Sequence, residues 1–236
     1  MEAAALADVP AEEMTYLCDG HGCGVSHSIR HGGHGKSNLL KHLTEVRYVL
    51  KKQLLCSDEE LLSAALFHSI YGTEGFQGKV MSLSTRSTLQ TLIGERAEFI
   101  AYMNCVMDRA SLDKAVCEMK ANDTQYEFIV MSREELGGES IAMTREQLRD
   151  LMIVHFADWA QQVASFPFWN YRREEYANIA KTLGGIYTKV HAEIMSTEPV
   201  DAEDNLPEMV RARKLGVFDQ VMRGEVKYDD LFDQKV

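Results

Sequence analysis

The chain has 236 residues, of which 45% are hydrophobic and 26% charged, as is typical of a globular protein with a full core. Its 25 lysines and arginines are outnumbered by 36 aspartates and glutamates, which gives a formal net charge of −11. This balance argues against binding of a nucleic acid polymer, because such binding depends on neutralising backbone phosphates with basic side chains.

The N-terminal sequence MEAAALADVPAEEM is acidic and weakly apolar, so it has the features of neither a secretory signal nor a transit peptide. No stretch reaches the roughly 20 apolar residues of a membrane-spanning helix. The five cysteines are an odd number, and several lie in segments with helical patterning, as reduced thiols do. We therefore expect a soluble, cytoplasmic protein that has no membrane partner.

Two segments of different character precede the first long helix. Residues 1–17 are expected to form a short helical lead-in, and residues 18–36 a loop rich in glycine and histidine. The cysteines and histidines of this loop are only loosely spaced as zinc ligands, since no second ligand pair stands at a fixed offset. Apolar residues at helical spacing then predict a helix over residues 37–52, with His42 on its inward stripe.

The next predicted helix begins with a capping motif. The string SDEE at residues 57–60 predicts a capping box, with the serine at the N-cap and the second glutamate at N3. The helix is expected to run to about residue 69 and to place His68 on its inward face. A glycine-punctuated loop follows, after which residues 87–109 are predicted to form one long helix and residues 111–120 a shorter one.

The second half of the chain adds a hairpin and more helices. Residues 125–142 contain two short runs of strand-forming residues separated by REELGG, which predicts a small β-hairpin. A second capping box, TREQ, opens a predicted helix over residues 144–164 that has Asp158 on its inward face. Helices over residues 171–195 and 207–222 are expected to follow. The predicted fold class is therefore all-α with one small hairpin.

Three of the inward-facing residues suggest a metal site. His42 and His68 lie on consecutive predicted helices, and Asp158 lies on a third. An inward carboxylate is costly to bury unless a cation or hydrogen-bond donors meet it. Two imidazoles and one carboxylate suit a divalent transition metal such as Mn, Zn or Fe, with open positions for water or substrate. A single inward histidine is more often an ordinary core residue, so the hypothesis depends on the combination of three.

The segment around His68, SDEELLSAALFHSIYG, resembles the second helix of HD-domain phosphohydrolases, where the family has an Ala-Ala-Leu-Leu-His-Asp run. By this resemblance His42 matches the first ligand histidine, and Asp158, in VHFADWAQQ, matches the last ligand aspartate. The string LIGERAEFIAYM is similar to the helix that follows the motif in the branch that hydrolyses guanosine tetraphosphate. The resemblance implies an HD-like helical bundle that binds metal.

A narrower resemblance concerns HGKSNLLKHL and LFHSIYGTEGF, which are similar to a family of uncharacterised HD-like proteins. In that family a histidine lies eight residues before the first ligand histidine, as His34 does here, and the HD pair is His-Ser before Tyr-Gly-Thr-Glu. Ser69 thus stands where HD enzymes have the aspartate that bridges two metals, which implies at most one tightly bound metal. The resemblance covers about residues 30–165 and implies one HD-like domain over residues 1–236, with C-terminal helices in 166–236.

The function implied by the resemblance is metal-dependent hydrolysis of a small phosphoester or nucleotide. A small-molecule substrate of this kind is compatible with the negative net charge, because a metal and a few local cations suffice to hold it. Glu74 or His34 is expected to take or relay the proton. Lys36, Tyr71 and Arg86 are the residues expected to contact the phosphorylated substrate.

Two other functions stay open. One is a mononuclear iron oxygenase of the HD type; the di-iron form is disfavoured, because no histidine lies between His68 and His155. The other is a catalytically inactive HD-like protein that serves binding or scaffolding, since the chain lacks the aspartate of the HD pair.

Overall fold

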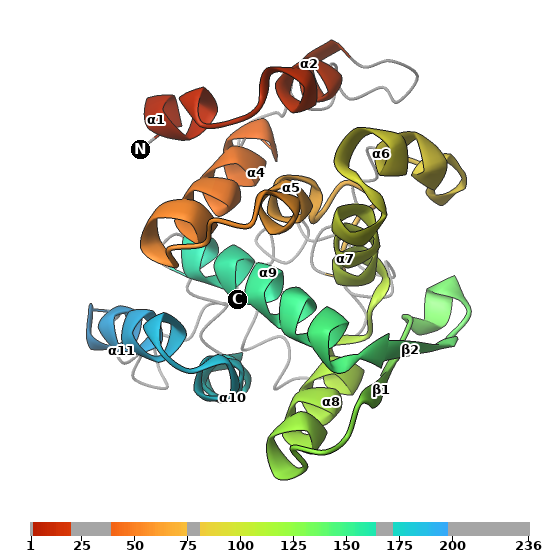
Figure 1. Ribbon diagram of the computed structural model, residues 1–236, viewed down its shortest axis with the longest axis vertical. Helices are drawn as coiled ribbons and strands as arrows, with labels where there is room; N and C mark the ends of the chain where they lie inside the picture. The colour runs from red at the N-terminus through yellow and green to blue at the C-terminus, as the bar shows by residue number, and fades with distance from the viewer. Residues whose placement is uncertain (1, 20–38, 75–80, 164–171, 198–236) are drawn as a thin grey trace, which may run out of the picture.

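The computed structural model describes residues 2–19, 39–74, 81–163 and 172–197. In these residues the chain forms ten α-helices and one two-stranded antiparallel hairpin (Figure 1), which confirms the predicted all-α class with a small hairpin. The helices are α1 (Glu2–Ala7), α2 (Ala11–Asp19), α4 (Leu39–Tyr48), α5 (Glu59–Phe67), α6 (Arg86–Ile93), α7 (Glu95–Val106), α8 (Arg109–Ala121), α9 (Arg145–Gln162), α10 (Arg173–Leu183) and α11 (Ile186–Thr197). The strands are β1 (Glu127–Met131) and β2 (Ser140–Thr144). Among the described helices, none combines the length and the apolarity needed to cross a bilayer.

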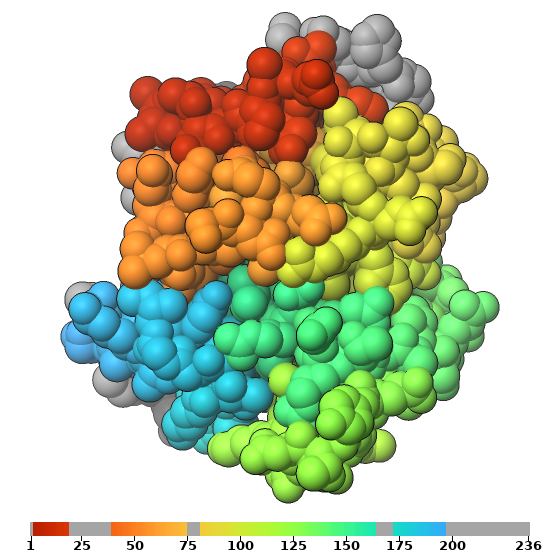
Figure 2. All heavy atoms as spheres, viewed as in Figure 1, coloured from red at the N-terminus to blue at the C-terminus, as the bar shows by residue number. Residues whose placement is uncertain are grey.

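Helix α9 is the centre of the fold. It packs against α4, α5 and α7 on one side and against α10 on another, and the hairpin lies at its N-terminal end (Figure 1). Every residue from 150 to 159 is buried, so this part of α9 has no solvent-exposed face. The space-filling view shows the segments as bands, with α1 and α2 at one end of the molecule and α8 at the other (Figure 2). Asp158 therefore lies on the most enclosed helix of the described structure.

Helix α5 is almost as enclosed, and its first turn differs from the prediction. All residues from 61 to 71 are buried, including His68, which caps the helix C-terminus. The N-cap is Asp58, whose carboxylate accepts hydrogen bonds from the backbone N–H groups of Glu60 and Leu61 at 3.1 and 3.3 Å. The predicted cap at Ser57 is thus wrong by one residue. A carboxylate is favoured there because it also meets the guanidinium of Arg96 at 2.9 Å.

Glycines divide two helices that were each predicted to be continuous. The segment 87–109 is broken at Gly94, whose φ of +88° ends α6 and begins α7. The segment 171–195 is broken at Gly184 and Gly185, with φ values of +71° and +54°, between α10 and α11. Side chains rarely adopt such positive φ angles, so glycine is required at these corners. Helical periodicity continues on both sides of each break and therefore hides it.

The hairpin and the second capping box agree closely with the sequence. The strands pair from Glu127 with Thr144 to Met131 with Ser140, two residues further along the chain than the predicted 125–142. Thr144 ends β2 and is the N-cap of α9, where its hydroxyl accepts from the backbone N–H of Gln147 at 3.2 Å and the Gln147 side chain accepts in return at 2.9 Å. This predicted capping box is confirmed, and it fixes the start of α9. The predicted helix over residues 207–222 lies outside the described residues.

Candidate metal centre

The three expected ligands converge from three helices. His42 lies in α4, His68 at the C-terminus of α5 and Asp158 in α9, and their ligand atoms all lie within 4.8 Å of one another. The two Nε2 atoms are 3.0 Å apart, and the Oδ1 atom of Asp158 is 3.4 Å from His42 Nε2 and 3.3 Å from His68 Nε2. Atoms that bind one ion at 2.0–2.2 Å are separated by roughly 2.8–3.6 Å. The three observed separations fall in this range.

Both histidine rings are oriented by a hydrogen bond from the nitrogen that faces away from the cluster. The Nδ1–H of His68 donates to the backbone carbonyl of Ala65 at 2.7 Å, and that of His42 donates to Gln161 Oε1 at 2.9 Å. The Gln161 amide is oriented in turn, because its nitrogen donates to Glu45 Oε2 at 2.8 Å. The Nε2 atoms of both rings therefore face each other and Asp158. Metal-binding histidines are held in this way.

This arrangement brings two imidazole nitrogens and one carboxylate oxygen together, a group of atoms suited to a metal ion, and the Gln162 side-chain nitrogen donates to the same Asp158 oxygen. The side chains of His68 and Asp158 are 1% and 6% exposed, and that of His42 is 14% exposed, so water screens their mutual repulsion weakly. Burial, together with the neighbouring His68, lowers the pKa of His42 to about 4, which disfavours a proton on this ring at neutral pH. Burial works to raise the pKa of Asp158, yet His68 and His42 hold it well below the usual value. Neutral imidazole and ionised carboxylate are the states in which these groups bind metal.

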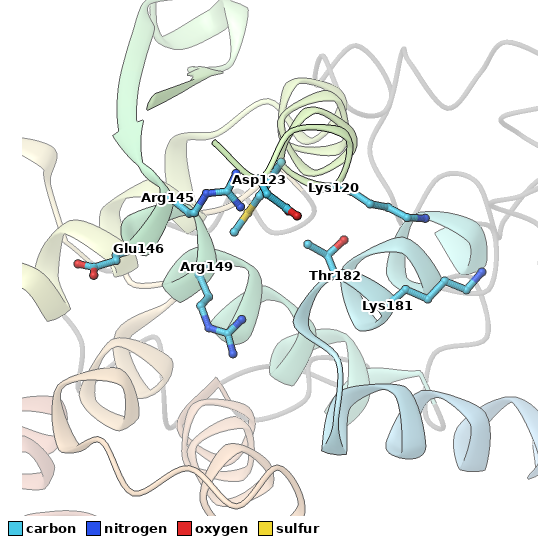
Figure 3. A pocket seen from close by; sticks show the side chains of 8 residues that line it. Lys120, Asp123, Arg145, Glu146, Arg149, Lys181 and Thr182 are labelled. Atoms are coloured by element: carbon cyan, nitrogen blue, oxygen red, sulfur yellow. The ribbon is translucent and has the colours of Figure 1, made fainter. Parts of the chain in front are cut away.

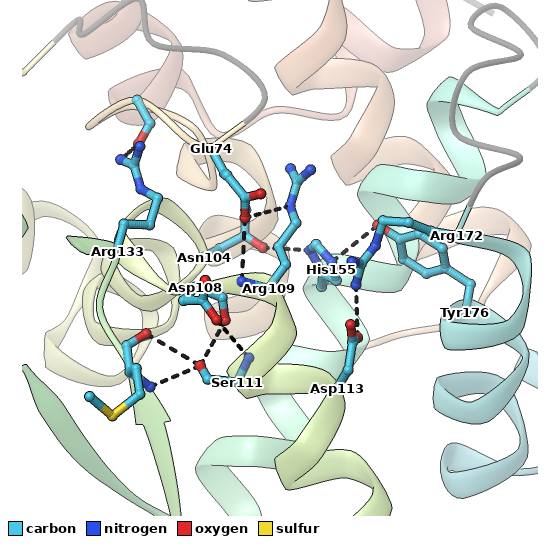
Figure 4. A network of polar contacts seen from close by, with 12 residues as sticks. Glu74, Asn104, Asp108, Arg109, Ser111, Asp113, Arg133, His155, Arg172 and Tyr176 are labelled. Atoms are coloured by element: carbon cyan, nitrogen blue, oxygen red, sulfur yellow. Dashed lines mark hydrogen bonds and ion pairs between the residues drawn. The ribbon is translucent and has the colours of Figure 1, made fainter. Parts of the chain in front are cut away.

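A polar network that sequence analysis did not identify fixes His68 from behind. Figure 4 shows its members Asn104, His155 and Tyr176. The Asn104 amide donates to the backbone carbonyl of His68 at 3.0 Å and accepts from the Nδ1–H of His155 at 3.0 Å. The other ring nitrogen of His155 accepts from the Tyr176 hydroxyl at 3.0 Å. The thiol of Cys105 also contacts the His68 carbonyl oxygen, at 3.1 Å. Helices α7, α9 and α10 thereby hold the end of α5 that carries the ligand.

The only signal for this network in the sequence is His155, which lies three residues before Asp158 and so shares a face of α9. Burial lowers the pKa of His155, and the guanidinium groups of Arg109 and Arg172 lower it further. His155 is therefore a neutral ring that joins two hydrogen bonds. In the described structure it is a support for the cluster and not part of the ligand group.

The two predicted substrate contacts in the described residues meet at Glu98, which is 0% exposed. The Tyr71 hydroxyl donates to Glu98 Oε1 at 3.0 Å, and Arg86 donates to both carboxylate oxygens at 2.7 Å. Arg86 also lies over the ring of Tyr102, 3.6 Å from its centroid. Arg86 thus joins α6 to α7, and Tyr71 joins the segment after α5 to α7. Their contact with a substrate stays a prediction.

Of the two predicted proton carriers, only Glu74 lies in the described residues. Its carboxylate accepts from the backbone N–H of Arg109 at 3.3 Å and lies 3.8 Å from the Arg109 side chain (Figure 4). Glu74 does not belong to the group formed by His42, His68 and Asp158, and its role as a proton carrier stays a prediction. His34, Lys36 and the other histidines of the 20–38 segment lie outside the described residues.

Ser69, at the position of the missing aspartate, is 3% exposed. Its hydroxyl oxygen is fully buried and has no hydrogen-bond partner within the described part of the chain. A buried hydroxyl without a partner is uncommon in folded proteins. The residue next to the ligand His68 therefore offers a polar atom but no charge.

Comparison with known proteins gives one match. The model of a family described only as a domain of unknown function, DUF6817, matches residues 25–109. The matched segment includes His42 and His68 and ends before Asp158. Neither the curated proteins nor the solved structures contain a match.

Proposed function

We propose that the chain binds one divalent transition metal through His42, His68 and Asp158. The observation that carries this proposal is the meeting of the two histidine Nε2 atoms and the Asp158 Oδ1 atom at separations of 3.0–3.4 Å, on three helices that bury them. The Gln162 side-chain nitrogen also donates to Asp158 Oδ1. The outer hydrogen bonds of both rings are those that orient metal-binding histidines.

We further propose that the site hydrolyses a small phosphoester or nucleotide. The metal would supply hydroxide at neutral pH and polarise the phosphoryl oxygen. Asp158 keeps its charge. Ala65 of α5 and Asn104 of α7 maintain the orientation of His68, and Gln161 of α9 maintains that of His42. Glu74 is proposed to take the proton, a role that requires it to exchange its contact with Arg109 for one with substrate water. Support for the reaction type comes from the resemblance of the sequence to HD-domain phosphohydrolases.

One observation favours a second candidate. Two histidines and one carboxylate that converge on a point are also the ligand set of mononuclear iron oxygenases. These enzymes leave the remaining positions open for oxygen and substrate. The third possibility, an inactive binding protein, is motivated by Ser69, because it leaves the site without the second aspartate of the HD pair.

Elemental analysis of protein purified without a metal-binding tag tests the metal site. We expect one equivalent of Mn, Zn or Fe, and loss of this metal in His68→Gln. The matched control is His191→Gln, which changes a half-buried histidine that stacks on Trp159 and lies outside the ligand group. Wild-type protein that takes up no metal from any of these ions, or a control variant that loses as much metal, would contradict the proposal.

Activity is tested separately with a panel of phosphoesters and nucleotides, assayed with Mn, Mg, Zn and Fe under air and under nitrogen. Phosphate release that His68→Gln abolishes and His191→Gln preserves supports the hydrolase. Turnover that requires both iron and air identifies the oxygenase instead. A loaded metal with no turnover in either atmosphere favours the binding protein.

The proposed stoichiometry of one metal is tested at Ser69. Ser69→Asp places a carboxylate at a position that is 3% exposed, which is costly unless a cation accompanies it. The variant is expected to bind a second equivalent and to gain more thermal stability from added metal than the wild type. An unchanged stoichiometry of one would show that Ser69 is not what limits the site.

A further inference from the structure

A hollow lined mainly by positively charged side chains lies where three helices end or begin. It has a volume of about 430 Å³ and is formed by the C-terminus of α8, the N-terminus of α9 and the C-terminus of α10 (Figure 3). The space-filling view shows the depression where these bands meet (Figure 2). Its lining residues are Met119, Lys120, Asp123, Arg145, Glu146, Arg149, Lys181 and Thr182. This volume is in the range of small-molecule sites.

Four cations line the hollow in a protein whose formal net charge is −11. In the described part of the chain, no carboxylate lies within ion-pair distance of Lys120, Arg149 or Lys181. Arg145 donates to the backbone carbonyls of Asn122 and Gln125, which orient its guanidinium but do not neutralise it. The positive charge of the hollow is therefore largely uncompensated by the protein.

The two arginines are placed where the helix itself disfavours them. Arg145 and Arg149 are four residues apart, so they share a face of α9, and like charges at this spacing destabilise a helix. They also lie in its first two turns, where the positive end of the helix dipole favours acidic residues. Lys120 and Lys181, in contrast, lie at the C-terminal ends of α8 and α10, where the helix dipole favours positive charge. A bound anion would offset the unfavourable contribution of the two arginines to the stability of α9.

We propose that this hollow binds a small polyanion with a phosphoanhydride group, such as inorganic pyrophosphate or the diphosphate of a nucleotide. Guanidinium groups bind phosphate oxygens in a bidentate manner, and lysines add point charges from the opposite wall. The lining also contains Asp123 and Glu146, but the Glu146 carboxylate points away from the other side chains (Figure 3). Asp123 remains close to the cations, but the four cations of the lining still exceed its two carboxylates, and several spread cations favour a ligand with several negative charges.

The hollow is separate from the candidate metal centre. Arg149 precedes Asp158 by nine residues on α9, which corresponds to about 14 Å along the helix axis. A ligand bound by Arg149 and Lys181 therefore does not reach the three metal-binding side chains directly. This inference is independent of the proposed hydrolase function.

Isothermal titration calorimetry with sodium pyrophosphate tests the proposal on the full chain. We expect binding in the micromolar range, weakened at least tenfold in the double variant Arg149→Gln/Lys181→Gln. The matched control is Lys52→Gln/Lys189→Gln, which removes two exposed positive charges outside the hollow and is expected to change the affinity less than twofold. Equal weakening in both double variants would mean that only net charge matters, and that result would overturn the proposal.

Two further titrations locate the site and define the ligand. His68→Gln is expected to bind pyrophosphate as the wild type does; loss of binding in this variant would place the anion at the metal centre instead. Orthophosphate is expected to bind at least tenfold more weakly than pyrophosphate, and equal affinities would refute the preference for a polyanion. The absence of any pyrophosphate binding up to millimolar concentration would also refute the proposal.

Discussion

Replacement of Asn104 by alanine is the sharpest test of how the fold holds the metal centre. The side chain is buried and links two groups that are themselves buried, the His68 carbonyl and the His155 Nδ1–H. Asn104→Ala leaves the ring N–H without an acceptor, while the carbonyl keeps only the Cys105 thiol. An unsatisfied buried polar group costs about 1–3 kcal/mol, so we expect the free energy of unfolding to fall by roughly 2–4 kcal/mol.

The same change is expected to weaken metal binding, because the His68 backbone loses its principal restraint. Loss of an outer hydrogen bond at a metal site typically reduces affinity about 10–100-fold. Urea denaturation of the metal-free protein measures the stability, and competition with a chelating dye measures the affinity. The two measurements separate a loss of folding from a loss of positioning.

Ser111→Ala is the matched control. Its hydroxyl accepts from the Met131 backbone N–H at 2.9 Å and joins α8 to β1, away from the ligands (Figure 4). This variant is expected to lose about 1 kcal/mol of stability and to keep its metal affinity. If Asn104→Ala bound metal as tightly as Ser111→Ala, the network would be a feature of the core with no bearing on the site.

Three other predictions concern pH, backbone and charge. The pKa of His42 falls from 6.5 to about 4 on folding, so the unfolded state takes up the proton first as the pH is lowered. The free energy of unfolding of the metal-free protein should therefore fall by up to about 3 kcal/mol between pH 6.5 and pH 4. In urea titrations, His42→Gln should remove most of this pH dependence of stability. Gly94→Ala, at a φ of +88°, should destabilise the chain by about 1–3 kcal/mol in thermal melts. Gly185→Ala should lower the stability less, because its φ is +54° and no atom lies near the added methyl group. Glu98→Gln should cost about 3 kcal/mol in urea denaturation, because it leaves Arg86 without its carboxylate; a loss below 1 kcal/mol would contradict the assignment of this pair as a brace.

The sequence predicted that His42, His68 and Asp158 face the interior, because each falls on the apolar side of a periodic segment. All residues from 61 to 71 and from 150 to 159 are buried, so burial by itself does not distinguish His68 and Asp158 from their neighbours. That all three meet depends on how α4, α5 and α9 pack, which periodicity does not encode. The expectation that they meet came instead from the resemblance to the HD motif.

The supporting residues were not predictable in this way. Asn104 and Tyr176 lie on helices that are distant in sequence, and a buried asparagine or tyrosine has many possible partners. The breaks at Gly94 and Gly184 were hidden for a different reason, since the apolar pattern keeps its phase across them. Local patterns thus identified the helices, the hairpin and the buried faces of the helices. The long-range hydrogen bonds and the backbone angles at the glycines required the structure.

The charge of the proposed centre bears on what it binds. Asp158 is the only carboxylate in the ligand group, because the other two members are histidines and Ser69 stands where HD enzymes have a second carboxylate. A divalent ion held by these groups keeps one unit of positive charge in a site where Asp158 and His68 are almost fully buried. Hydroxide or a phosphate oxygen would neutralise that charge, and in an enclosed site this attraction is much stronger than in water. A second aspartate would remove the excess charge, so we expect the serine to make the centre more receptive to an anionic ligand and to limit it to one metal.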